Sequence, residues 1–330
     1  MKIDARVTRD IALDQCLYVQ LSTTRDFNMI QRNRNHQTTE EKVWFVTGCS
    51  SGFGRQIAMR LLELGRRTVV CAREPADIKD LAEFKNALTL CLDVTNRTQV
   101  EEAVGLAEKH FGRIDVLVNN AGIGYFGAVE ESDEDEVRKM FEVNFFGLCR
   151  MIHVALPGMR ERGSGTIVNI SSIAGLRSFP SLGYYSASKF AVEGLSEALW
   201  QEVEPLGIKV MLVEPSGFRT DWAGRSANET QSPIDDYSST AGRAMKMVRE
   251  SSGQQPGDPE RAAIAIIDAV ESSDIPHRLL LGNDAFDGAM SKIEELRKSF
   301  LAWEEVSRSA DFSDDPMNTA AASIGVANQG

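Results

Sequence analysis

Short apolar runs alternate with amphipathic stretches along the chain from residue 43 onward. Short apolar runs are typical of parallel strands buried on both faces, and apolar positions three or four apart are typical of helices. The runs predict strands at residues 43–47, 68–72, 88–92, 116–118, 165–170 and 209–213. The stretches between them predict helices at residues 56–64, 97–111, 133–148, from after 180 to about 204, and 285–303. This alternation predicts an α/β fold, a Rossmann-type doubly wound parallel sheet in three layers.

The same pattern predicts one folded domain at residues 42–305 with an extension at each end. Residues 1–41 are polar and lack a sustained period, which predicts a disordered extension; the alternative is a partner-binding or targeting arm. Residues 217–258 form a long stretch rich in Ser and Gly, which predicts a lid. Residues 306–330 drift into small and polar residues and predict a flexible tail, after a C-terminal helix extension.

Composition argues against several classes of function. A net charge of −12 and a pI near 5.0 oppose binding to nucleic acid. No run approaches the ~20 apolar residues of a membrane span, and the first ten residues mix charges, so a cytoplasmic protein is predicted. Five widely spaced cysteines predict reduced, buried thiols, and four scattered histidines predict no metal site.

The ends of the predicted strands carry polar or glycine residues. Gly48, Gly52 and Gly54 lie between the first strand and its helix, where glycines let a backbone approach a pyrophosphate. Arg73 follows the second strand, at the place where an acid would hold the ribose of NAD. Its planar fork can pair with a 2′-phosphate, which favours NADP(H); the alternative is a solvated loop charge. Asn119 and Asn120 end the fourth strand, where turn formation and ligand contact both stay open.

Tyr185 and Lys189 are four residues apart within a predicted helix, so their side chains lie on one face. A neighbouring cation favours the anionic form of a phenol, so the pair predicts a tyrosine with a lowered pKa; the alternative is an ordinary surface helix. Asn144 interrupts an apolar helix face, and a buried amide there needs hydrogen-bond partners. Residues 130–136 are densely acidic and predict a solvated helix start with Ser132 as N-cap.

Taken together, these residues resemble the short-chain dehydrogenase/reductase family in its common single-domain form. The resemblance covers residue 43 to at least residue 281, and the motifs occur in the family's order. They are Thr47-Gly48-x-x-x-Gly52-x-Gly54, Asp93-Val94, Asn119-Asn120-Ala121-Gly122, Asn144, Ser172 and Tyr185-x-x-x-Lys189. The resemblance implies an NADP-binding Rossmann catalytic domain.

The resemblance also implies a role for each matching residue. Tyr185 is implied to be the general acid/base, and Lys189 to lower its pKa and hold the nicotinamide ribose. Ser172 is implied to donate to the substrate oxygen, and Asn144 to position a water or backbone relay behind Lys189. The implied cofactor contacts are Gly48, Ser50, Ser51, Gly52, Phe53, Gly54, Arg73, Asp93, Val94, Asn120, Ala121, Gly122, Tyr185, Lys189, Pro215, Phe218 and Thr220.

Two positions depart from the family pattern. Ser216 replaces the glycine of the usual Pro-Gly turn, next to the expected nicotinamide. Ser51 precedes Gly52 where a basic residue would favour a phosphate, so the expected preference for NADP(H) over NAD(H) depends on Arg73.

The predicted function is hydride transfer between NADP(H) and a carbonyl or secondary alcohol of an apolar small molecule. The apolar preference comes from a cluster near the predicted catalytic strand ends, which could equally be core: Phe179, Pro180, Leu182, Phe218 and Trp222. Alternatives are a catalytically silent dinucleotide-binding regulator, an NAD-dependent alcohol dehydrogenase of the same fold, and a sugar-nucleotide epimerase or dehydratase. By analogy with the family, a homodimer or homotetramer is expected.

Overall fold

A seven-stranded sheet runs through the computed structural model, which describes residues 41–312. Every pairing in this sheet is parallel, in the order β3-β2-β1-β4-β6-β7-β9. The strands are β1 (Val43–Val46), β2 (Arg67–Ala72), β3 (Ala87–Cys91), β4 (Val116–Asn119), β6 (Gly165–Ile170), β7 (Ile208–Pro215) and β9 (Arg278–Leu281). The predicted Rossmann-type fold is confirmed, and β9 is a strand that the apolar pattern missed.

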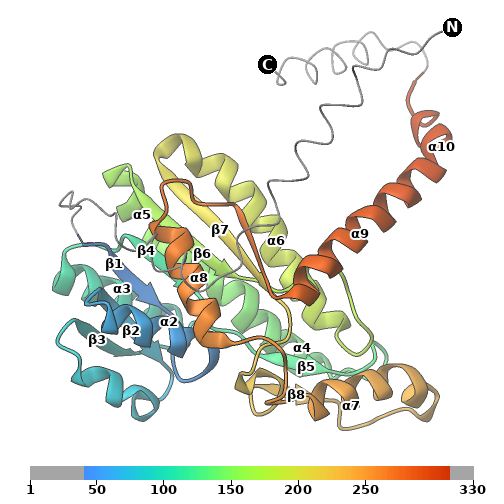
Figure 1. Ribbon diagram of the computed structural model, residues 1–330, viewed down its shortest axis with the longest axis horizontal. Coiled ribbons are helices and arrows are strands. Elements are labelled where there is room, and N and C mark those ends of the chain that lie inside the picture. The colour runs from blue at the N-terminus through green and yellow to red at the C-terminus, as the bar shows by residue number, and fades with distance from the viewer. Residues whose placement is uncertain (1–40, 313–330) are drawn as a thin grey trace, which may run out of the picture. The chain divides into compact units, whose positions relative to one another are not determined.

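Helices cover both faces of the sheet and make three layers (Figure 1). Side chains on one face of the sheet pack against α2 (Gly52–Glu63) and α8 (Pro259–Glu271). Those on the other face pack against α3 (Arg97–Phe111), α5 (Leu148–Arg162) and α6 (Gly183–Val203). The strand order reverses at β1, which lies between β2 and β4, and open α/β sheets bind ligands in the crevice at such a point.

The helix predicted at residues 133–148 is part of a longer helical segment. It begins as α4 (Glu134–Phe141), passes through a π-helical turn at Glu142–Gly147 and continues as α5. The predicted N-cap Ser132 is wrong, because Asp133 accepts from the amide of Glu136 at 3.0 Å. Ser132 lies one residue before the N-cap position, and its hydroxyl donates instead to the carbonyl of Ala128 at 2.8 Å.

The predicted lid carries secondary structure of its own. β8 (Ala227–Glu229) pairs with β5 (Gly124–Phe126) in a separate two-stranded sheet, and α7 (Arg243–Glu250) follows. Arg249 of α7 binds Glu229 and three backbone carbonyls between residues 223 and 227. The segment is thus held together by side chains rather than by a continuous sheet.

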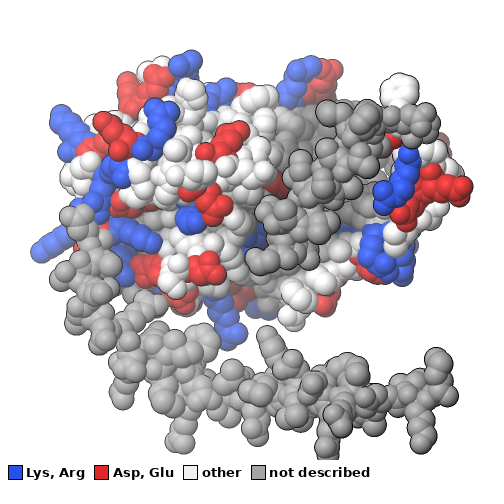
Figure 2. All heavy atoms as spheres, turned by 90° about the horizontal axis from the view of Figure 1, so that it is seen from above, with Lys and Arg blue, Asp and Glu red and all other residues white. Residues whose placement is uncertain are grey.

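The C-terminal helix extension consists of α9 (Asn283–Ala302) and α10 (Glu304–Arg308). Ala285 and Ala289 pack on the body, whereas Phe286, Ile293 and Phe300 are exposed. Among residues 41–312, no helix has the length and apolarity that crossing a membrane requires. Figure 2 shows basic and acidic side chains interspersed over one face of the molecule. The predicted extension at residues 1–41 and the end of the predicted tail fall outside the described residues, except for Glu41 and residues 306–312.

The cysteines depart in part from the prediction of buried thiols. Cys49 and Cys71 are buried, but Cys91 is exposed at the end of β3 and Cys149 is half-buried. All four described cysteines are free. Cys91 is exposed because β3 is an edge strand whose side chains are only partly covered.

Candidate active site

The glycine turn after β1 leaves no room for a side chain at Gly48 or Gly54. Gly48 and Gly52 have φ values of +69° and +57°, which L-residues rarely adopt. A Cβ atom on Gly54 would lie 2.3 Å from Nδ2 of Asn120 and 2.4 Å from the carbonyl oxygen of Gly48. Ser51 makes no side-chain cap to α2, and the first turn of α2 carries no acid. The turn therefore presents backbone N–H groups and a positive dipole end, as a pyrophosphate requires.

Asn120 fastens this turn to β4. Its Nδ2 donates to the carbonyls of Thr47 and Gly48 at 2.9 and 3.0 Å. Thr47 Oγ1 accepts in return from the amides of Asn120 and Ala121, at 3.0 and 3.1 Å. Asn119 instead donates to Asn169 inside the sheet, at 2.9 Å. Of the two amides, Asn120 shapes the glycine turn and Asn119 is a core residue.

The residues expected on the adenosine side of the cofactor follow β2 and β3, the two strands on the side of β1 away from β4. Arg73 follows β2, is exposed, and shows no ion pair or side-chain hydrogen bond within residues 41–312. Asp93 and Val94 follow β3; Oδ1 of Asp93 accepts from the amide and hydroxyl of Thr95, at 2.9 and 2.7 Å. The Arg73 side chain is thus available to a phosphate, whereas one carboxylate oxygen of Asp93 is already hydrogen-bonded to Thr95 in the same turn.

The hydroxyls of Ser172 and Tyr185 meet across the end of β6. Ser172 caps a short 3-10 helix (Ile173–Gly175) by accepting from the amide of Ala174 at 3.0 Å. Tyr185 lies in the first turn of α6, is 6% exposed, and is hydrogen-bonded to Ser172. The ring of Trp222 covers Tyr185, with ring centroids 4.8 Å apart. The two hydroxyls are therefore neighbours, and an apolar ring covers the tyrosine.

Lys189 lies one turn further along α6. Its Nζ is 5.8 Å from the centroid of the Tyr185 ring and donates to the carbonyl of Ile170 at 2.9 Å. Burial lowers the pKa of Lys189 to about 8, and the charge of Glu193 opposes this.

The expected lowering of the Tyr185 pKa by Lys189 is wrong in this structure. Burial raises the pKa of Tyr185 above its ordinary value, and the hydrogen bond with Ser172 only partly offsets this. The reason is geometric, because the ammonium group points at the Ile170 carbonyl. A neutral phenol results, which is a proton donor at neutral pH.

Asn144 lies in the π-helical turn, a feature frequent at functional sites. Its Oδ1 accepts from the amide of Ile123 at 2.8 Å, and its Nδ2 donates to the Ile123 carbonyl and to Ser188 Oγ at 2.9 and 3.2 Å. Ser188 donates in turn to the carbonyl of Tyr185 at 2.7 Å. Asn144 therefore connects the loop after β4 to α6; Ile123 and Ser188 were missed in the sequence because neither side chain departs from an ordinary loop or helix.

Two of the residues expected near the end of β7, Phe218 and Thr220, face the glycine turn. Pro215 ends the strand, and Ser216 donates its backbone amide to the carbonyl of Leu281 at 3.0 Å. Phe218 packs edge-on against Phe53, with ring centroids 5.0 Å apart. A Cβ atom on Gly52 would lie 3.4 Å from Thr220, so the start of the lid closes over the glycine turn.

A cavity of about 530 Å³ is lined by Ile173, the residue after Ser172, whereas Ser172 and Tyr185 do not line it. Its lining includes apolar Ile173 and Phe179, and also Arg177, Asp284 and Asp287. Sequence reasoning missed the three charged residues, because nothing in the pattern indicates that the start of α9 folds back onto the turn after β6. Leu182 is buried with Tyr185 under the lid, and Pro180 lies at the surface.

Comparison with known proteins agrees with this geometry. Residues 42–231 match the family model described as short chain dehydrogenase. The chain is 39% identical over 244 residues to the 3-ketodihydrosphingosine reductase of Bacteroides thetaiotaomicron, covering 74% of this chain and 88% of the relative. The structure of a short-chain dehydrogenase from Streptomyces avermitilis superimposes with a TM-score of 0.78 at 42% identity, over 83% of this chain and 100% of that one.

Two solved structures with bound cofactors are also similar. An alcohol dehydrogenase from Thermococcus sibiricus complexed with 5-hydroxy-NADP is 26% identical, with a TM-score of 0.61 over 73% of this chain and 96% of that one. A protein from Burkholderia phymatum in complex with NAD is 25% identical, with a TM-score of 0.65 over 84% and 97%. The glycine turn fits such a dinucleotide. The chain belongs to the short-chain dehydrogenase/reductase family and is an oxidoreductase of that family.

Proposed function

We propose that this protein transfers a hydride between NADP(H) and a carbonyl or secondary alcohol. The observation that carries the proposal is the hydroxyl pair of half-buried Ser172 and buried Tyr185, beside Lys189 and across β4 from the glycine turn. Gly48, Gly52 and Gly54 would form the pyrophosphate cradle. A bound nicotinamide would supply or accept the hydride.

The protein residues have separate tasks in this proposal. In the direction of reduction, negative charge develops on the substrate oxygen, and the hydroxyls of Ser172 and Tyr185 donate to it. Tyr185 gives up its proton as general acid, because its phenol carries that proton at neutral pH. Lys189 would hold the nicotinamide ribose and compensate the charge left on Tyr185. Asn144 would fix the loop after β4 relative to α6.

The preference for NADP(H) over NAD(H) depends on Arg73. Its guanidinium is exposed at the end of β2 and is able to form a bidentate pair with a 2′-phosphate. The Thermococcus and Burkholderia proteins were solved with an NADP derivative and with NAD, so the family accommodates both. Tighter binding of NADH than of NADPH would make this protein the NAD-dependent alternative.

The proposed substrate is a ketone or alcohol with an apolar body. Trp222 and Leu182 surround Tyr185 with apolar surface, and Phe179 and Ile173 extend that surface into the cavity. The relative from Bacteroides acts, by its name, on 3-ketodihydrosphingosine, a long-chain ketone. Arg177 and Asp284 would face a polar end of the substrate, away from its chain.

Assembly and location complete the proposal. Phe146 and Phe190 are 47% and 45% exposed, and Phe190 lies on α6, the helix that carries Tyr185. Covering them would favour a homodimer or homotetramer, which sedimentation at several concentrations would detect. The free described cysteines suit a reducing cytoplasm.

The decisive experiment is a panel of ketones and alcohols, assayed in both directions with both cofactors. Tyr185→Phe should lower kcat for reduction by about 100-fold or more, because it removes the proton donor. Tyr184→Phe is the matched control: it removes the neighbouring hydroxyl and should leave kcat within about twofold. An unchanged kcat in Tyr185→Phe, where chemistry limits the rate, would rule out the proposed proton transfer. Cofactor binding without turnover of any compound would favour a regulator.

A further inference from the structure

The last helices of the described chain, α9 and α10, begin on the body and then extend away from it (Figure 1). At the base of α9, Ala285 and Ala289 pack with Ile173 and Leu280. Beyond that base, none of residues 290–312, where the described part ends, is buried. Helices in proteins are stabilised mainly by packing of an apolar face, so a helical segment of this length requires a surface to pack on.

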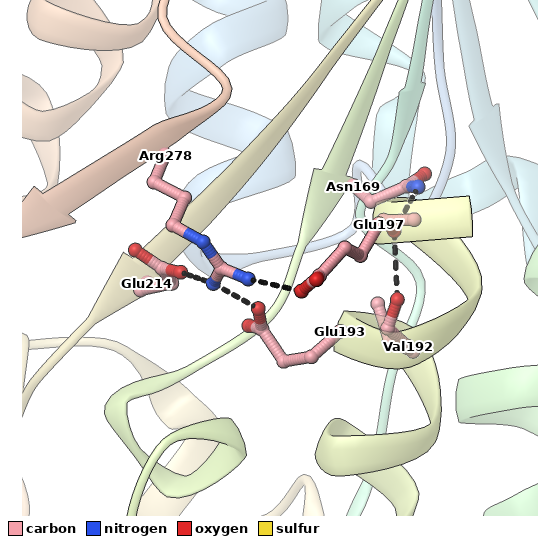
Figure 3. A network of polar contacts seen from close by, with 7 residues as sticks. Asn169, Val192, Glu193, Glu197, Glu214 and Arg278 are labelled. Atoms are coloured by element: carbon pink, nitrogen blue, oxygen red, sulfur yellow. Dashed lines mark hydrogen bonds and ion pairs between the residues drawn. The ribbon is translucent and has the colours of Figure 1, made fainter. Parts of the chain in front are cut away.

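The base of α9 is fixed by β9, the strand directly before it. Arg278 at the start of β9 donates to Glu193 on α6 and to Glu214 on β7, each at 2.6 Å, and to Glu197 at 3.2 Å (Figure 3). Only Gly282 separates β9 from α9. Since β9 is anchored to both β7 and α6, α9 leaves the body from a fixed strand and not from a long linker.

A regular row of apolar side chains runs along the part of α9 that lies off the body. Ile293, Leu296, Phe300 and Trp303 follow one another at intervals of three, four and three residues, and they are 38–67% exposed. This row is the apolar seam. Its alternating spacing puts the four side chains on one helix face, and it is the spacing with which one helix packs lengthwise on another.

The charges near the seam are paired within α9 itself. Glu294 pairs with Arg297 at 2.9 Å and with Lys298 at 3.8 Å, and Glu295 pairs with Lys292 at 2.8 Å. Together α9 and α10 carry six acidic and four basic side chains. An anionic lipid surface attracts basic amphipathic helices, so the charge of this segment opposes such a partner.

The exposed apolar surface of α9 is large enough for an interface. Phe286, Met290 and Leu301 extend the seam and are 52–57% exposed. With about half of each of these seven side chains exposed, the apolar surface is on the order of 600 Å² per copy, since a whole aromatic side chain buries about 150–250 Å². A standard interface takes about 800 Å² from each partner, so a symmetric pair of such faces comes close to one.

A second copy of the seam matches the first when the two helices run in opposite directions. In the same direction, Lys292 of one copy would lie against Arg297 of the other on both flanks, because these residues flank the seam five positions apart. In opposite directions each flank faces the same flank of the other copy. The flank of Lys292 also holds the uncharged Ser299 and Val306, and the flank of Arg297 also holds Glu304, of opposite charge.

We propose that the apolar seam is an interface with a second copy of this chain, in which the two α9 helices pack side by side in opposite directions. The interface is separate from the surface around Phe190 on α6, so a chain that uses both assembles into a tetramer. The inference goes beyond the proposed function and does not depend on it, because no residue of the candidate active site lies in the seam.

The test is sedimentation equilibrium of the full chain at several concentrations. Ile293→Glu combined with Phe300→Glu places two charges in the seam, so it should raise the dissociation constant about 100-fold or more and halve the mass of the assembly. Ser291→Glu combined with Ala302→Glu is the matched control: it adds the same charges to the same helix outside the seam and should leave the mass unchanged.

Arg297→Glu tests the direction of the two helices. In opposite directions it places an acid on the flank of Glu304 and should weaken association. In the same direction it would replace a contact between like charges by one with Lys292, so unchanged or tighter association would contradict the proposed pairing.

An unchanged mass in the folded seam variant would overturn the proposal, as would a wild-type monomer at every concentration. If the seam variant does not fold, hydrogen exchange of the wild-type protein decides: the amides of residues 293–303 should be protected at high concentration and lose that protection on dilution. Exchange that does not depend on concentration would overturn the proposal. Binding of a wild-type monomer to phosphatidylcholine vesicles, with or without phosphatidylserine, would assign the seam to a lipid surface instead.

Discussion

The two proposed halves of the site, one for the cofactor and one for the substrate, are built on different principles. The cofactor half, around β1 and β4, is fixed by backbone: Gly48 and Gly54 have no room for a Cβ atom, and Asn120 bonds to main-chain carbonyls. The substrate half, from Ser216 through the lid to the start of α9, is held by side chains such as Arg249 and Trp222. Where the backbone has to come close to a ligand, only glycine fits. An apolar cover, in contrast, can be built from many different side chains.

The sharpest way to break this contrast is Gly54→Ala. The added methyl group would lie 2.3 Å from Asn120 and 2.4 Å from the Gly48 carbonyl, both of which are fixed by their own hydrogen bonds. We expect cofactor affinity to fall by 100-fold or more, about 2.7 kcal/mol, and stability to fall by about 1–3 kcal/mol. Titration of cofactor fluorescence and thermal unfolding measure the two effects.

Gly105→Ala is the control for that experiment. Gly105 lies inside α3, and a Cβ atom there would meet nothing within 4 Å. Alanine is the better helix former by about 1 kcal/mol, so this variant should be slightly more stable and bind the cofactor normally. Normal cofactor binding by Gly54→Ala would show that the turn can shift, and that the backbone account is mistaken.

The same contrast explains what the sequence was able to predict. Gly48, Gly52 and Gly54 indicated a tight turn after the first strand, because glycine at those positions has a steric cause that a pattern can reveal. Six strands of the sheet were predicted from apolar runs, since parallel strands are buried on both faces. β9 was missed because it starts with Arg278 and forms the edge of the sheet.

Long-range contacts between charged side chains could not be predicted. Asp284 and Asp287 line the cavity because α9 packs back on the turn after Ser172, more than a hundred residues earlier in the chain. The raised pKa of Tyr185 comes from burial, and Trp222, which packs on its ring, is another contact distant in sequence. The four-residue spacing correctly predicted that Tyr185 and Lys189 lie on one face of the helix. It could not predict where the ammonium group points, because that depends on its hydrogen bond to the Ile170 carbonyl.

Arg73→Ala should have a smaller and more selective effect. The guanidinium is exposed and has no partner in the described part of the chain, so its removal should cost little stability. We expect the Kd of NADPH to rise about tenfold, or about 1.4 kcal/mol, with the Kd of NADH nearly unchanged. Arg97→Ala, which removes an exposed arginine paired with Glu101 on α3, is the control. Equal weakening of both cofactors would mean that Arg73 does not read the 2′-phosphate.

The smallest effect is expected from Arg249→Met, which tests the substrate half alone. Arg249 donates to Glu229 and to the carbonyls of Ala223, Gly224 and Ala227, and lies 4.7 Å over the ring of Phe126. Its loss should leave those carbonyls short of donors and loosen the cover over Tyr185, raising KM for an apolar ketone about three- to tenfold.

The cofactor Kd should not change in Arg249→Met, because Asn120 and Thr47 hold the glycine turn independently of the lid. Arg243→Met, at the exposed start of the same helix, should leave KM and Kd as they are. Thr220 at the start of the lid faces Gly52. If Arg249→Met raised both the cofactor Kd and the KM, a change in the lid would therefore also alter the glycine turn. The two halves would then have to be described as one mechanical unit.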